Sequence, residues 1–102
     1  MHIPKFLHYL EKVKRYSPHT ITAYKKDLAQ FEEYLDGQSP EDANHKEVRG
    51  WIVELMGAEI SPRSINRKIT TLKTFYKYLQ REGIIEASPM VKVSSLKTKK
   101  QV

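Results

Sequence analysis

The chain has 102 residues, 39% of them hydrophobic and 29% charged, so it is long enough for one domain with one core but too short for a multilayered enzyme. It has no cysteine, which excludes disulfides and thiolate metal sites, and no apolar run near the roughly 20 residues of a membrane span. The net charge of +6 favours a polyanionic partner, and the start has no signal-like apolar segment, so a cytoplasmic location is expected.

Two amphipathic helices are predicted in the first third of the chain. Apolar residues recur at helical spacing over residues 3–15, where Pro4 suits a first turn. A second helix follows Ser17, which suits an N-cap, and ends at Asp36-Gly37. Its expected core face comprises Ile21, Tyr24, Leu28, Phe31 and Leu35.

A third helix is predicted after the turn-rich connection of residues 37–44. Asn44 and Glu47 have the spacing of a capping box, and apolar residues continue at helical spacing to about Gly57. Gly50 lies inside this helix, where glycine lowers helix stability by about 1 kcal/mol relative to Ala. A fully regular helix is therefore less strongly predicted here. Residues 36–59 hold six acidic and two basic residues, so this helix is expected to face away from a polyanion.

The fourth helix carries the strongest functional signal. Ser61, Pro62 and Gly83 suit its N-cap, its first position and its C-terminal end. Ile65, Ile69, Leu72, Tyr76 and Leu79 form the apolar stripe, and the opposite side carries Arg63, Arg67, Thr70, Thr74, Lys77 and Arg81, with Asn66 and Lys73 on one flank. Residues 61–82 hold six basic residues and one acidic residue, whereas solvated faces usually mix both signs. This composition is typical of a helix that contacts phosphates, although a solvated surface helix is the alternative.

The chain after Gly83 is predicted to return to the core and then become extended. Ile84 and Ile85 are expected to fold back, and Ser88-Pro89 can begin a short fifth turn. Residues 94–102 have several cations and no apolar periodicity, which indicates an extended basic linker, or a solubilising tail as the alternative. The expected organisation is therefore an all-α helical domain over residues 1–93 and a linker over 94–102.

The second and fourth helices share a template at an offset of 44 residues. Both begin Ser-Pro-x-Thr/Ser-Ile, so each presents free backbone N–H groups and a hydroxyl at its positive end, where phosphate binds readily. No catalytic or metal-binding constellation accompanies them: the four histidines are scattered, and there is no Gly-rich phosphate loop. The chain on its own is expected to bind rather than catalyse, without a cofactor.

The order of these motifs resembles a known family. The motifs are Phe6-Leu7-x-Tyr9-Leu10, Tyr16-Ser17-x-x-Thr20-x-x-x-Tyr24-x-x-Asp27-Leu28-x-x-Phe31, Ser61-Pro62-x-Ser64-Ile65-x-Arg67 and Leu72-x-x-Phe75-Tyr76. This pattern is similar to the N-terminal core-binding (SAM-like) domain of tyrosine site-specific recombinases, the phage integrase and Xer-type enzymes. The resemblance implies a compact four-helix orthogonal bundle that forms one half of a clamp around double-stranded DNA in the nucleoid.

The same resemblance implies that a catalytic domain for DNA integration or recombination follows the linker, and that recombinases of this type assemble on DNA. The family's catalytic residues are absent from this chain. Contacts with DNA are implied for Ser17, Thr20, Lys25 and Lys26 of the second helix and for Arg63, Ser64, Asn66, Arg67 and Lys73 of the fourth. The polar face of the fourth helix adds Thr70, Thr74 and Lys77, and the basic linker adds Lys97, Lys99 and Lys100.

Two other functions fit the sequence. A helix-turn-helix regulator would use residues 57–61 as its turn and residues 64–73 as its recognition helix, but the long fourth helix and the lack of a dimerisation segment speak against it. A helical protein-interaction module would present the basic face to an acidic protein. Competition by DNA for that face separates the second alternative from DNA binding.

Overall fold

Four α-helices account for most of the chain, as the sequence predicts. The computed structural model describes residues 2–93 and contains α1 (Ile3–Lys12), α2 (Pro18–Leu35), α3 (His45–Gly57) and α4 (Pro62–Arg81), with 3-10 turns η1 (Pro40–Asp42) and η2 (Pro89–Lys92). No strand occurs in these residues, so the all-α prediction is confirmed. No helix among them is long and apolar enough to cross a bilayer.

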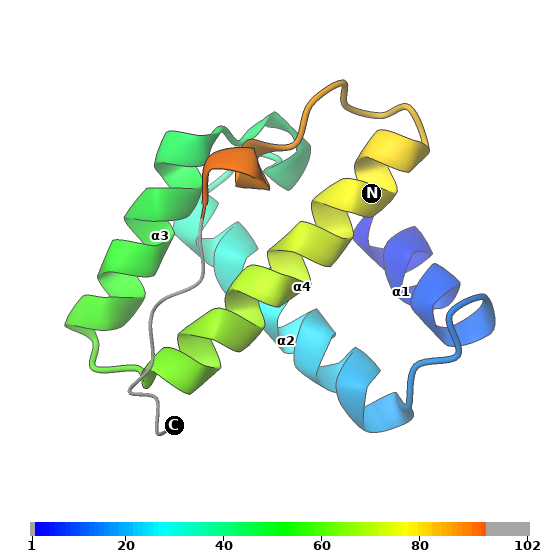
Figure 1. Cartoon of the computed structure of the whole chain (residues 1–102), viewed down its shortest axis with the longest axis horizontal. Coiled ribbons are helices and arrows are strands. Elements are labelled where there is room, and N and C mark those ends of the chain that lie inside the picture. Colours follow the sequence, from blue (N-terminus) through cyan, green and yellow to red (C-terminus); the bar gives the residue numbers. More distant parts are fainter. Residues whose placement is uncertain (1, 94–102) are drawn as a thin grey trace, which may run out of the picture.

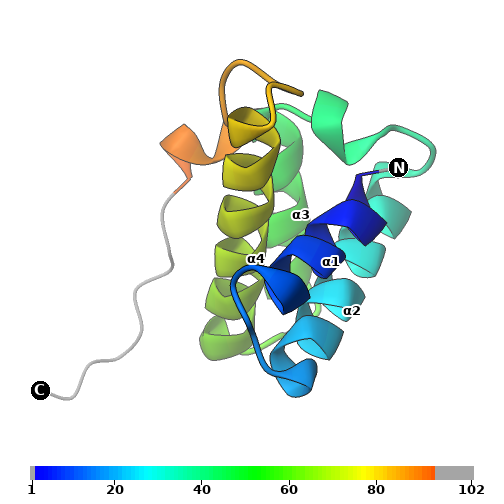
Figure 2. The ribbon, with the colours of Figure 1, turned by 90° about the vertical axis from the view of Figure 1, so that its right-hand side faces the viewer.

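Helices α2 and α4 cross at the centre of the molecule, with α1 on one side of the crossing and α3 on the other (Figure 1). Turn η2 packs against α3 and α4. The resulting bundle measures 35 × 29 × 22 Å, and the crossing of α2 and α4 agrees with the expected orthogonal bundle (Figure 1). Both helices that begin with Ser-Pro start at the lower end of the molecule in the two views (Figures 1 and 2).

The predicted caps set the helix boundaries. Ser17 Oγ accepts from Thr20 N at 3.2 Å, and Ser61 Oγ accepts from Ser64 N at the same distance. Asn44 and Glu47 form the complete capping box of α3. Gly83 follows α4 with φ +76°, the left-handed conformation that glycine adopts without strain.

Helix α1 ends earlier than its apolar spacing predicts. The last helical residue is Lys12, not Arg15, because Arg15 adopts a left-handed φ of +57° and turns the chain toward α2. The amide of Tyr16 donates to Leu10 O at 3.0 Å and holds this turn. Val13, one of the apolar residues at helical spacing within residues 3–15, is therefore 61% exposed.

Aromatic side chains fill much of the core. Phe6 lies at its centre, with ring centroids 5.2 Å from Phe75 and 5.4 Å from Tyr78. Tyr76 is fully buried, and its hydroxyl donates to Pro40 O at 2.5 Å, which ties η1 to α4. Half-buried Ile84 and Ile85 pack against this core, as predicted.

Gly50 allows α2 and α3 to approach closely. A Cβ at this position would collide with the Tyr34 hydroxyl of α2, so any larger residue requires the tyrosine ring to shift. The helix remains regular through Gly50. The glycine therefore makes room for Tyr34 and does not interrupt the helix.

Candidate nucleic-acid interface

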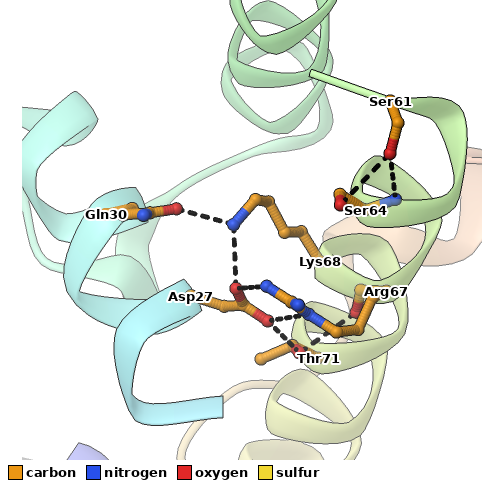
Figure 3. A network of polar contacts seen from close by, with 7 residues as sticks. All are labelled: Asp27, Gln30, Ser61, Ser64, Arg67, Lys68 and Thr71. Atoms are coloured by element: carbon orange, nitrogen blue, oxygen red, sulfur yellow. Dashed lines mark hydrogen bonds and ion pairs between the residues drawn. The ribbon is translucent and has the colours of Figure 1, made fainter. Parts of the chain in front are cut away.

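A buried carboxylate joins the two crossing helices (Figure 3). Asp27 of α2 is completely buried and accepts hydrogen bonds from three residues of α4. Arg67 donates from Nη2 to Oδ1 at 2.6 Å and from Nε to Oδ2 at 3.2 Å, and Lys68 Nζ donates to Oδ1 at 2.9 Å. Thr71 Oγ1 donates to Oδ2 at 2.9 Å. These contacts fix the crossing point of α2 and α4.

Opposing effects set the pKa of Asp27. Burial alone would raise the pKa, but hydrogen bonds from Arg67, Lys68 and Thr71 outweigh burial and hold it below its ordinary value. The hydrogen bond to Asp27 likewise raises the pKa of Arg67. Lys68 is buried and also donates to Gln30 Oε1 at 2.7 Å. The carboxylate is therefore ionised at neutral pH and balances positive charge inside the protein.

This network changes the expected roles of two basic residues of α4. Arg67 was predicted to contact DNA, but both nitrogens that it offers to Asp27 are committed to the fold, although its side chain stays 48% exposed. Lys68 counted toward the basic composition of α4 but points inward. The positive charge available on the surface of α4 is therefore smaller than the composition suggests.

The remaining predicted residues of α4 lie at its surface. Arg63, Thr70, Lys73 and Lys77 are exposed, and Ser64, Asn66 and Thr74 are half-buried. Ser17 and Ser61 are exposed at the helix starts, where each hydroxyl is engaged with the hydroxyl of Thr20 or Ser64, at 3.0 and 3.2 Å. The outward face of α4 thus follows the predicted 3.6-residue pattern.

The two adjacent lysines of α2 point in different directions. Asp27 faces α4, and at roughly 100° per residue Lys25 lies about 160° around the helix from Asp27, on the side away from α4. Lys26 is only about 100° from Asp27, on the flank that also carries Gln30. The structure therefore brings Lys26, but not Lys25, toward the exposed side of the α2 and α4 crossing.

Sequence reasoning missed Asp27 and part of the surface beside α1. Asp27 lies between Tyr24 and Leu28 on the apolar stripe of the sequence. A carboxylate at such a position indicates a buried charge that needs a basic partner.

A second feature that the sequence did not reveal is a hollow at the end of α4, lined by Tyr9, Lys14, Tyr16, Thr74, Lys77, Tyr78 and Arg81. Only Thr74 and Lys77 of these residues were assigned to DNA.

The predicted linker contacts Lys97, Lys99 and Lys100 lie outside the described residues, as does the rest of the linker over 94–102. Within residues 2–93 no group of three or more His, Asp or Glu residues is placed to hold a metal ion.

Known proteins share this sequence pattern. The family model described as phage integrase, N-terminal SAM-like domain, matches residues 3–83. Proteins named tyrosine recombinase XerC are similar to the whole chain or most of it: the one from Oceanobacillus iheyensis is 37% identical over 100% of the chain and 34% of its own length. The Bacillus subtilis relative is 35% identical over 95% of the chain and 33% of its own length. The chain thus spans about a third of the curated relatives that it matches, and no solved structure matches it.

Proposed function

The chain belongs to the phage integrase N-terminal SAM-like domain family, and on that premise we propose that it binds double-stranded DNA for site-specific recombination. It would form the DNA-holding part of a tyrosine recombinase, whose strand cleavage and rejoining depend on a separate catalytic domain of the parent chain. The names of its relatives support this role, because they are tyrosine recombinases about three times as long as the residues matched.

One observation carries the proposal. Residues 17–30 of α2 and 61–81 of α4 contain a single acidic residue, Asp27, and that carboxylate is completely buried. Over these two ranges the exposed side chains of both helices therefore include cations but no carboxylate, and exposed Glu32 and Glu33 follow at the C-terminal end of α2. Such a surface attracts a polyanion, whereas a face designed only for solubility usually mixes charges.

The expected contacts are mainly to phosphates. Arg63, Lys73 and Lys77 are exposed on α4, and Lys26 extends from α2 on the side of the crossing. An α-helix fits the major groove of B-DNA, so we expect exposed Arg63 and half-buried Asn66 of α4 also to contact bases. Because each neutralised phosphate releases counterions, affinity should fall steeply as salt rises.

The adjacent lysines of α2 provide a matched test. We expect Lys26→Ala and Arg63→Ala each to weaken binding to a duplex in fluorescence anisotropy and to lower the slope of log K against log salt by about one. Lys25→Ala removes the same charge from the same helix but on the far side, so its slope should stay close to that of the unmodified chain. Circular dichroism verifies that all three variants are folded.

Equal behaviour of Lys25→Ala and Lys26→Ala would show that only total charge matters and would contradict the proposed surface. Absence of duplex binding even at low salt, together with binding of an acidic protein, would favour the protein-interaction module. A helix-turn-helix regulator would instead bind a palindromic site as a stable dimer.

A further inference from the structure

A small basic hollow lies where the C-terminal half of α4 meets the loop between α1 and α2. Its volume is about 230 Å³, and its walls come from α1, this loop and α4. Lys14, Lys77 and Arg81 supply three cations, and tyrosines 9, 16 and 78 supply the aromatic surface. None of the residues that line the hollow is acidic.

Backbone and ring contacts hold the walls in place. The amide of Lys14 donates to Tyr9 O at 3.2 Å, so the loop is tied to α1 at this point. The Tyr16 ring packs edge-on against Tyr24 at 5.9 Å, and the Tyr9 and Tyr78 rings lie 5.1 Å apart. The hollow is therefore part of the folded structure and not a gap between unattached side chains.

Arg81 is positioned by a tyrosine rather than by an acid. Its Nη1 donates to the Tyr9 hydroxyl at 2.5 Å, and its Cζ lies 5.2 Å from the centroid of the Tyr9 ring. None of the ion pairs found within residues 2–93 involves Lys14, Lys77 or Arg81, so these three cations have no carboxylate partner there. Their charge is available to an anion from outside.

The size of the hollow limits what that anion can be. Pockets for drug-sized ligands are typically 300–1,000 Å³, so a volume of about 230 Å³ suits a single phosphate group better than a whole nucleotide. Thr74, Lys77 and Arg81 also continue the outward stripe of α4 that starts at Arg63. An anion in the hollow would therefore lie on the same line as the proposed DNA contacts.

The geometry points to a phosphate site: we infer that Lys14, Lys77 and Arg81 hold one backbone phosphate of bound DNA in this hollow. This inference rests on the proposed DNA binding and extends the DNA contact to the loop before α2. Tyr16 directly precedes the Ser17 cap, so the phosphate would also approach the positive end of α2.

Salt-dependent anisotropy with an arbitrary duplex tests the inference. The variants are Lys14→Ala, Lys77→Ala and the double variant, and the control is Lys46→Ala, an exposed lysine on α3. Each hollow variant should bind the duplex several-fold more weakly than the control. Because both lysines would hold the same phosphate, which Arg81 still contacts, the double variant should lower the salt slope by at most about one and not by two.

The outcomes separate this inference from the function on which it rests. If Lys26→Ala weakens binding and both hollow variants bind like Lys46→Ala, DNA binding stands and the phosphate site is wrong. A slope loss near two in the double variant would also overturn the inference, since it indicates two separate phosphates. If neither Lys26→Ala nor the hollow variants change binding, the proposed function itself fails.

Discussion

The crossing of α2 and α4 and the hollow at the end of α4 differ in what neutralises their cations. At the crossing, Arg67 and Lys68 meet the buried carboxylate of Asp27. In the hollow, Lys14, Lys77 and Arg81 meet no carboxylate of the described residues. One helix therefore carries cations that hold the fold together and cations that remain available to a ligand.

Composition alone does not distinguish these two roles, because both regions contribute equally to the basic character of α4. The distinction depends on a residue 40 positions earlier in the chain, which reaches Arg67 across the crossing. Substitutions in the first region should act on stability, and substitutions in the second region should act on binding.

The largest expected effect follows removal of the carboxylate. Asp27→Ala leaves the buried Lys68 without its anion, and breaking a buried pair in this way costs about 3–5 kcal/mol of the free energy of unfolding. Urea denaturation measures the loss. Glu33→Gln, which neutralises an exposed acid on the same helix, is the control and should change stability by less than about 0.5 kcal/mol. Similar losses in both variants would show that Asp27 has no special role.

The pH dependence of stability should show the contribution of Asp27 without removing its side chain. The pKa of Asp27 is lower in the folded chain than its ordinary value, so the unfolded chain binds more protons as the solution becomes acidic. The stability that Asp27 contributes is fully present above its unfolded pKa of about 4 and is lost as the pH falls through the folded pKa. Urea midpoints between pH 6 and 2 should therefore fall less steeply in Asp27→Asn than in the unmodified chain. Parallel curves would contradict the depressed pKa.

Two basic residues of α4 give the direct contrast between the regions. Arg67→Ala should lower the free energy of unfolding by about 2 kcal/mol, less than Asp27→Ala, because Lys68 and Thr71 still contact the carboxylate. Lys77→Ala should change it by less than about 0.5 kcal/mol, because Lys77 is exposed and has no ion-pair partner among the described residues. Urea denaturation of both variants measures the difference. A larger loss in Lys77→Ala than in Arg67→Ala would reverse the comparison.

Local sequence signals predicted most of the fold. The caps at Ser17, Ser61 and Asn44 act between residues three apart, so their spacing reveals them directly. The end of α1 was not predictable in the same way, because the left-handed Arg15 depends on how the chain turns toward α2. Non-glycine residues adopt this conformation only in particular settings that no local pattern specifies.

The candidate site was only partly predictable for a related reason. Helical spacing placed Arg63, Thr70 and Lys77 on the surface, since one helix determines its own faces. Two features of the site join distant segments of the chain. Arg67 pairs with Asp27, and Lys14 lines the same hollow as Arg81. Such contacts depend on the packing of helices, which apolar periodicity indicates without specifying the partners.

The most direct test of the account is to map where DNA contacts the protein. A ¹H–¹⁵N NMR titration with a duplex at low salt follows the amide signal of each non-proline residue. We predict that the largest shifts fall on residues 14–26 and 63–81, with little change on α3 between residues 46 and 56. Shifts concentrated on α3, or an unchanged spectrum, would contradict the claim that the unpaired cations of α2 and α4 form the DNA-binding surface.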